Sequence, residues 1–454
     1  MVLGTLAAVI WQARGLSALS PWDLRAVWFT LWQAVVSASL SALLAVPVAR
    51  ALARRRFRGR GALITLLGAP FILPVIVAVM GLVSVFGRNG FVNEALAAAG
   101  FAKVSIYGWQ GVILAHVFFT LPLATRLVLH GWQAIPSERF RLAQSLGFGP
   151  RDVARHLERP MLRAVLPGVW LAVFLVCLTS FTVALALGGG PRATTVELAI
   201  YQAFRFDFDM GRAAALGLVQ VALCLAALAI ARRVSVPEAF GAGLDRALPL
   251  PAPGGWRRGG DALAVTLAAG FLIAPMAAVI AKGVPRLTAL PPLVWEATAR
   301  SVVMALISSG LTLTLALALA MALADGRRRW VEAAGMLPLV ASPLVLGTGL
   351  YLILRDFAAP AALALPVTVA INAVMALPFA LRALIPEARA LHADYARRAQ
   401  SLNLRGRARM RLMVLPRLSR PPGLAGGLAA ARAMGVLGGF TQCGCADRGT
   451  LPRG

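Results

Sequence analysis

Charged residues are scarce in this chain of 454 residues. They make up 14% of it, against 59% hydrophobic residues and a mean hydropathy of +0.77. Soluble domains are about a quarter charged, so this composition excludes an ordinary soluble protein. Uncharged apolar stretches, each near the ~20 residues that cross a bilayer, recur along the chain. The sequence therefore predicts an all-α polytopic membrane protein.

Acidic residues are scarcer than basic ones. The chain has 18 Asp and Glu residues against 45 Lys and Arg residues. The centres of the apolar stretches hold almost no carboxylates, since Asp325, Glu332 and Asp356 lie at their ends. A proton-coupled transporter needs carboxylates at depth in the membrane. Their scarcity argues against a self-sufficient secondary transporter and favours an energy source outside the membrane.

The excess of basic residues gives a net charge of +27. The arginines lie in short clusters between apolar stretches, which is typical of cytoplasmic loops under the positive-inside rule. A nucleic-acid-binding protein would gather them on one soluble face. We therefore expect lipid around the chain and no nucleic acid as a partner.

Cysteine is equally scarce, with four residues in the chain. Cys177 and Cys224 lie inside apolar stretches, so they form no disulfide framework. Cys443 and Cys445 flank one glycine, and this pair alone is too weak a pattern to predict a metal site.

The apolar stretches predict about eleven spans. Residues 2–10 are too short to cross a bilayer and lack the basic segment of a signal peptide, so we expect a partial first helix. The remaining expected spans are residues 27–50, 62–87, 111–130, 164–188, 212–231, 262–281, 299–323, 331–355, 361–381 and 421–439.

The two halves of the chain repeat each other. The tetrapeptide Ala-Gln-Ser-Leu at residues 143–146 recurs at residues 399–402, 256 positions later. The motif Leu-Pro-x-Ala-x-Arg at residues 121–126 recurs at residues 377–382 with the same separation.

This register predicts a first repeat at residues 1–232, a cytoplasmic linker at 233–261 and a second repeat at 262–454. The linker is rich in proline, glycine and arginine. The last span of the first repeat has no counterpart in the second, which we therefore expect to be truncated at its C-terminal end.

Each repeat carries one basic amphipathic loop, at residues 138–160 and 392–416. In the first loop, Phe140, Ala143 and Leu146 follow one another at helical spacing, and arginines surround them. This pattern predicts a short helix that presents apolar side chains ringed by positive charge.

A bend is expected in the middle of each loop. Gly147 can end the first short helix in the left-handed conformation, and Asn403 can do so in the second copy. A second short helix should follow Pro150, carry Leu157 on its apolar face and end near Pro160. A single loop of this kind could be an ordinary solvated connector. Two copies in one register favour a surface that docks into a groove of a cytoplasmic partner.

The loops resemble the EAA loop of type I ABC importer permeases, which has a small residue, a glycine, an apolar residue and a Leu-Pro pair at fixed spacing. Asn403 and Arg159 depart from the family pattern, and Glu138 stands five residues before Ala143. The ATPase-coupling residues that the resemblance implies are Glu138, Phe140, Ala143, Leu146, Gly147, Leu157, Pro160, Ala399, Leu402, Asn403, Met413 and Pro416.

Three further segments look like the fused thiamine permeases of binding-protein-dependent importers. They are residues 51–56, 111–126 and 188–203. The resemblance extends to about residue 435. It implies two tandem type I permease repeats in the bacterial inner membrane, and solutes that are thiamine and its phosphates. A periplasmic thiamine-binding protein would deliver the solute. A cytoplasmic ABC ATPase dimer would bind ATP and Mg²⁺, so this chain would hold no cofactor and catalyse no reaction.

Candidate residues for the solute pathway are the polar groups inside the spans. His116 and Asn372 occupy equivalent positions in the two repeats, and Ser180 and Thr182 lie in the fifth span of the first. Hydrogen bonding between helices, or to the backbone of their own helix, is the alternative role for these groups.

Three alternatives remain at the level of the sequence. One is a fused permease for ferric iron or another small solute, and the second is a secondary transporter or channel. The third is a non-functional truncated remnant.

Overall fold

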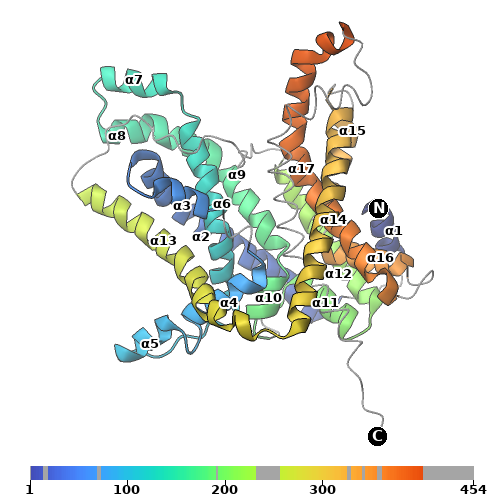
Figure 1. The fold of residues 1–454 in the computed structure, drawn as a ribbon. Helices are drawn as coiled ribbons and strands as arrows, with labels where there is room; N and C mark the ends of the chain where they lie inside the picture. Colours follow the sequence, from blue (N-terminus) through green and yellow to red (C-terminus); the bar gives the residue numbers. More distant parts are fainter. Residues whose placement is uncertain are drawn as a thin grey trace. The chain divides into compact units, whose positions relative to one another are not determined.

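The computed structural model describes residues 2–13, 19–68, 73–190, 193–231, 256–324, 329–339, 343–354 and 360–401. Every regular element in these ranges is a helix (Figure 1). The prediction of an all-α fold is confirmed for these ranges.

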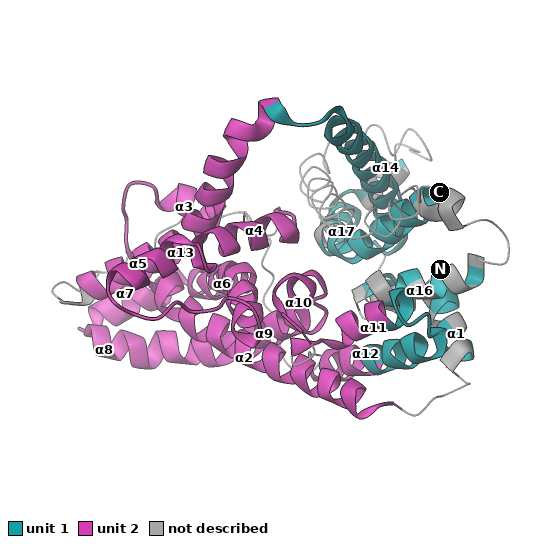
Figure 2. Cartoon of the chain, turned by 90° about the horizontal axis from the view of Figure 1, so that it is seen from below, with its two compact units in different colours: residues 1–17, 203–221, 289–454 teal, residues 18–202, 222–288 magenta. Residues whose placement is uncertain are grey.

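The chain forms two compact units (Figure 2). Unit 1 contains residues 1–17, 203–221 and 289–454, and unit 2 contains residues 18–202 and 222–288.

Unit 2 is built around three long helices, α2 (Pro21–Arg54), α6 (Trp109–Gln133) and α9 (Arg159–Leu178), which pack against one another. The buried face of α2 consists largely of alanine and serine, whose small side chains let membrane helices approach closely. Polar groups join the helices. The hydroxyls of Ser41 and Thr120 lie 2.7 Å apart, and the Gln33 amide donates to the Cys177 carbonyl at 3.0 Å.

Unit 2 also contains α13 (Trp256–Gly283), the first helix of the second sequence repeat. It packs against α4 (Val75–Phe86) and α2. The Phe271 ring lies between the rings of Phe86 and Phe118, with centroids 6.2 and 5.7 Å away. The boundaries of the compact units therefore differ from those of the sequence repeats expected at 1–232 and 262–454.

Unit 1 likewise contains a helix from the other sequence repeat. Helix α1 (Val2–Ala13), from the first repeat, packs against α16 (Pro343–Leu354) of the second. Gly349 makes this approach possible, because a Cβ there would lie 2.5 Å from the Thr5 carbonyl oxygen. Each repeat thus contributes its first helix to the unit formed mainly by the other.

The main helix pair of unit 1 repeats that of unit 2. Helix α14 (Pro292–Ala322) packs against α17 (Pro360–Ser401). The residues Ala316, Ala320, Leu323 and Ala324 at this contact are buried. They match the spacing of the buried residues Ala45, Ala49, Leu52 and Ala53 in α2.

The second predicted span is broken in both repeats, which corrects the expectation of continuous helices at 62–87 and 331–355. In the first repeat, α3 (Arg60–Leu66) ends and α4 begins at Val75 after Pro74, whose extended ψ of 133° precedes the helix. In the second repeat, α15 (Arg329–Met336) and the 3₁₀ turn η5 (Leu337–Leu339) precede α16, which starts at Pro343. Proline favours such a start because it lacks an N–H and fixes φ.

The span expected at 164–188 is also interrupted. Helix α9 ends at Leu178, and α10 (Thr182–Leu187) follows after a short non-helical segment. The remaining elements are α5 (Phe91–Ala98), α11 (Val196–Arg205), α12 (Met210–Ala231) and the 3₁₀ helix η4 (Val284–Ala289).

Eight helical segments in the described part of the chain are long and apolar enough to cross a membrane. The predicted count of about eleven is not confirmed. The three expected spans that are absent from these eight are 2–10, which is the short helix α1, 331–355, which is broken, and 421–439, which lies outside the described residues.

The contact of α4 with α13 gives a test of the helix exchange. A Cβ on Gly81 would lie 2.5 Å from the backbone oxygen of Pro275. We expect Gly81→Ala to force the two helices apart and to lower stability by about 1–3 kcal/mol. Thermal unfolding in detergent measures this change. Gly270→Ala in α13 is the control, since no atom lies within 4 Å of its added Cβ; equal midpoints for both variants would contradict the packing.

Candidate functional site

The first basic loop begins where α6 ends. Pro136, with an extended ψ of 137°, precedes the short helix α7 (Ser137–Ser145). Gly147 follows it with φ +70°, and the Phe148 N–H donates to the Ala143 carbonyl at 2.9 Å. The predicted helix and its left-handed glycine are both confirmed.

The second short helix continues into the membrane span. Helix α8 (Pro150–Val153) passes into a π-helical turn, η2 (Ala154–Glu158), and then into α9. The expectation that Pro160 ends this helix is wrong. The Arg159 N–H donates to the Ala154 carbonyl, five residues back, and this wider turn precedes the proline.

The exposed apolar face of α7 is not the face predicted from spacing. Phe140 and Ala143 are 0% and 3% exposed, so they pack inside this chain and are not available to a partner. Leu142 and Leu146 are 60% and 61% exposed. They lie four residues apart, on a common face of the helix. Of the predicted coupling residues, Leu146 therefore belongs to the outer surface, and Leu142 joins it.

Positive charge surrounds this leucine pair. The arginines at 139, 141, 151, 155 and 159 are exposed, as are Glu138, Gly147 and Pro160, whereas Leu157 is half-buried. The pKa of the Glu138 carboxyl lies below its usual value, because it accepts hydrogen bonds from its own backbone, from Ser137 and from Arg141. The loop thus presents two leucines in a predominantly basic surface.

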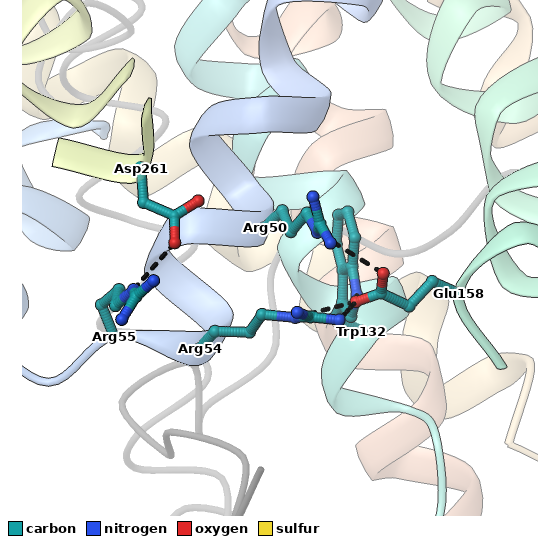
Figure 3. A network of polar contacts seen from close by, with 6 residues as sticks. All are labelled: Arg50, Arg54, Arg55, Trp132, Glu158 and Asp261. Atoms are coloured by element: carbon teal, nitrogen blue, oxygen red, sulfur yellow. Dashed lines mark hydrogen bonds and ion pairs between the residues drawn. The ribbon is translucent and has the colours of Figure 1, made fainter. Parts of the chain in front are cut away.

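Glu158, at the end of the π turn, is the buried carboxylate of the site (Figure 3). Its Oε1 accepts hydrogen bonds from Arg54 Nε at 3.0 Å, from Arg54 Nη2 at 2.6 Å and from Trp132 Nε1 at 3.1 Å. Its Oε2 lies 3.4 Å from Arg50 Nε. We call these four residues the Glu158 clamp. It joins the loop to the ends of α2 and α6.

A second ion pair lies beside the clamp. Arg55 Nε donates to Asp261 Oδ2 at 2.8 Å and ties the end of α2 to the start of α13. An open cleft of about 420 Å³ lies between α2, the loop and α13. Its lining is Pro47, Arg50, Pro150, Arg151, Ala154, Gly260, Asp261 and Ala264.

Sequence reasoning missed the clamp. Glu158 is one of two acidic residues between 139 and 160, and the other, Asp152, accepts a hydrogen bond from the Gly149 N–H at 3.0 Å. The one feature of the sequence that could have indicated the clamp is the isolated carboxylate of Glu158 among the arginines of the loop. Its partners come from α2 and α6, 104 and 26 residues away, and only the fold shows that they meet.

The second loop differs from the first where it begins. Helix α17 runs without a break to Ser401 and includes position 392, where a histidine replaces the proline found at 136. Ala399 lies in this helix. Leu402, Asn403, Met413 and Pro416 lie outside the described residues.

The pathway candidates lie at buried or broken positions. His116 and Asn372 are 3% and 5% exposed. Within the described part of the chain, both ring nitrogens of His116 and the amide nitrogen of Asn372 have no hydrogen-bond partner. Ser180 and Thr182 are half-buried; Ser180 lies in the break between α9 and α10, and Thr182 is the first residue of α10. No group of three or more His, Cys, Asp or Glu residues in the described ranges is placed to hold a metal ion.

Comparison with known proteins places the chain in a family. The family described as binding-protein-dependent transport system inner membrane component matches residues 41–235. The thiamine transport system permease protein ThiP of Brucella abortus (strain 2308) is 39% identical over 93% of this chain and 80% of its own length. The chain belongs to this permease family.

Two further relatives agree. The ThiP protein of Salmonella typhimurium is 39% identical over 93% of this chain and 81% of its own length. The ThiP protein of Escherichia coli (strain K12) is 37% identical over 100% of this chain and 87% of its own length. The permease is therefore a multi-pass component of the inner membrane and a translocation subunit rather than an enzyme. Permeases of this kind work with an ATPase and a binding protein.

The left-handed glycine gives a test of the bend in the first loop. We expect Gly147→Val to lower the midpoint of thermal unfolding, because a β-branched side chain at φ +70° costs about 1–2 kcal/mol. Gly147→Asn is the matched variant, which places at this bend the residue found at 403. It should retain nearly the full midpoint. An equal loss in both variants would show that something other than backbone conformation is responsible.

Proposed function

We propose that this permease carries thiamine and its phosphates across the inner membrane. The observation that supports this most directly is the likeness to three thiamine permeases, at 37–39% identity over 93% or more of the chain. A periplasmic thiamine-binding protein delivers the solute to the outer face. The relatives do not favour ferric iron as the solute.

The energy comes from ATP bound by a separate cytoplasmic ATPase dimer, together with Mg²⁺. The exposed leucines Leu142 and Leu146 enter an apolar groove of one ATPase subunit, and the surrounding arginines face acidic groups at the rim of that groove. A helix with apolar residues four positions apart is suited to this mode of docking. The second loop, at 392–416, docks on the other subunit. This chain needs no cofactor of its own.

The pathway through the membrane runs past the broken helices. Non-helical backbone at membrane depth is tolerated where protein buries it or where it lines a water-filled cavity. The break at residues 179–181 contains Ser180, is followed by Thr182 and is half-buried, and we assign it to the lining of the pathway. His116 and Asn372 supply unpaired polar atoms at equivalent positions of the two repeats.

Uptake in a strain that lacks its own thiamine permease tests the solute. We expect the permease, expressed with the ATPase and the binding protein of its own system, to restore uptake of labelled thiamine. Omission of any one component should abolish it. Uptake of ferric iron without thiamine would contradict the proposal, and so would uptake by the permease alone driven by an ion gradient in liposomes.

Docking of the ATPase is tested by Leu142→Asp with Leu146→Asp. Both side chains are exposed, so the change should leave the thermal midpoint unaltered. We expect the amount of ATPase that co-purifies to fall more than tenfold, since each buried leucine contributes about 1.5–3 kcal/mol. Leu287→Asp is the control, because Leu287 is an exposed leucine in η4, far along the chain from the loop. Unchanged co-purification of the ATPase with the double variant would contradict docking through α7.

A further inference from the structure

The two loops are connected to their membrane helices in different ways. In the first repeat the membrane helix α6 ends at Gln133. A separate helix, α7, begins at Ser137 directly after Pro136. In the second repeat α17 continues through the equivalent position to Ser401. A force on the second loop is therefore transmitted along one continuous helix. A force on the first loop reaches α6 only across a non-helical segment.

The Glu158 clamp bridges this break. The carboxylate and the Arg54 guanidinium have side chains that are 4% and 3% exposed. Oε1 accepts one hydrogen bond from the α6 indole and two from the fork of Arg54 on α2. Charge-assisted forked bonds of this kind fix geometry as well as energy. One side chain of the loop is thus held by both helices.

The clamp sits at an irregular turn of the loop. The turn Ala154–Glu158 is π-helical, and helices bend most readily at such irregular turns. The neighbouring cleft of about 420 Å³ leaves the loop without close packing on the side of Pro150 and Ala154. The polar contacts of Glu158 hold the turn from the side of α2 and α6.

The sequence of the second repeat does not repeat the residues of the clamp at the equivalent positions. The register of the loops places Ala388 at the position of Trp132 and Val414 at that of Glu158. When the spacing that matches α2 to α14 is continued along the sequence, Met321 stands at the position of Arg50 and Asp325 at that of Arg54. The second repeat thus has no carboxylate at the position of Glu158 and no indole at that of Trp132. At the position of Arg54 it has an acidic residue.

The burial of the clamp indicates whether its contacts stay formed throughout the transport cycle or open during it. Separating a buried ion pair leaves an uncompensated charge, which is strongly unfavourable. The clamp is therefore suited to remain closed.

We propose that Glu158 is a positioning residue that makes loop 138–160 move as one body with the cytoplasmic ends of α2 and α6. The second loop relies on the unbroken α17 for the same purpose. This inference rests on the permease function and not on the identity of the solute. ATP-driven motion thus enters the permease through two mechanically different connections.

The test is the number of solute molecules transported for each ATP hydrolysed by the complete transporter in proteoliposomes. With Glu158→Gln the ATPase should still bind, because the α7 leucines are unaffected. We expect the ratio of transport to hydrolysis to fall roughly tenfold, within the range of coupling between distant sites. Loss of folded protein alone lowers both rates together and leaves the ratio unchanged.

Three variants complete the experiment. Glu158→Asp keeps the charge and should restore part of the ratio. Trp132→Phe keeps the ring and removes one donor, so it should give a smaller fall even if Glu158→Gln fails to fold. Glu332→Gln removes the exposed ion pair of Glu332 with Arg389 at 2.7 Å and should leave the ratio as in the wild type.

An unchanged ratio in both Glu158→Gln and Trp132→Phe would overturn the proposal, as would an equal fall in Glu332→Gln. If the wild-type complex transports no thiamine, the proposed solute is wrong. The same variants are then compared by the stimulation of ATP hydrolysis by the binding protein, and loss of stimulation in Glu158→Gln alone supports the clamp.

Discussion

A hydrocarbon bilayer offers no hydrogen-bond partner to a backbone N–H or C=O group, and this constraint shapes the whole chain. It explains why the described residues form helices throughout. It also gives meaning to the places where the helices stop. The interruptions between α3 and α4 and between α15 and α16 occur at equivalent points of the two repeats, each followed by a helix that starts at or just after a proline. Such breaks need surrounding protein or water, and a translocation subunit can provide both.

Much of this fold could be predicted from the sequence, because apolar length and charge placement act locally. The long helices α2, α6, α13 and α14 lie where apolar stretches of sufficient length predicted them. Gly147 adopts the left-handed conformation expected of a glycine that ends a helix. The broken spans were missed, because hydropathy does not distinguish a continuous helix from two shorter ones separated by a turn.

The site was less predictable, because its decisive contacts join distant parts of the chain. Helical spacing grouped Phe140, Ala143 and Leu146 but could not tell which side of α7 the rest of the protein covers. Burial of Phe140 moves the outer surface to Leu142 and Leu146. Glu158 illustrates the same limit, since its partners Arg54 and Trp132 are brought to it only by the packing of α2, α6 and α9. A buried carboxylate is stable there because donors from two helices satisfy it.

The exchange of first helices bears on how the protein is made. When α13 leaves the ribosome, its partners α2 and α4 have already been synthesised, so it can pack at once. Helix α1 ends at Ala13, and its partner α16 begins only at Pro343. At about 5–20 residues per second, α1 waits on the order of tens of seconds for that partner. We therefore expect unit 2 to assemble during synthesis, whereas the contact of α1 with α16 forms only after the second half has been made.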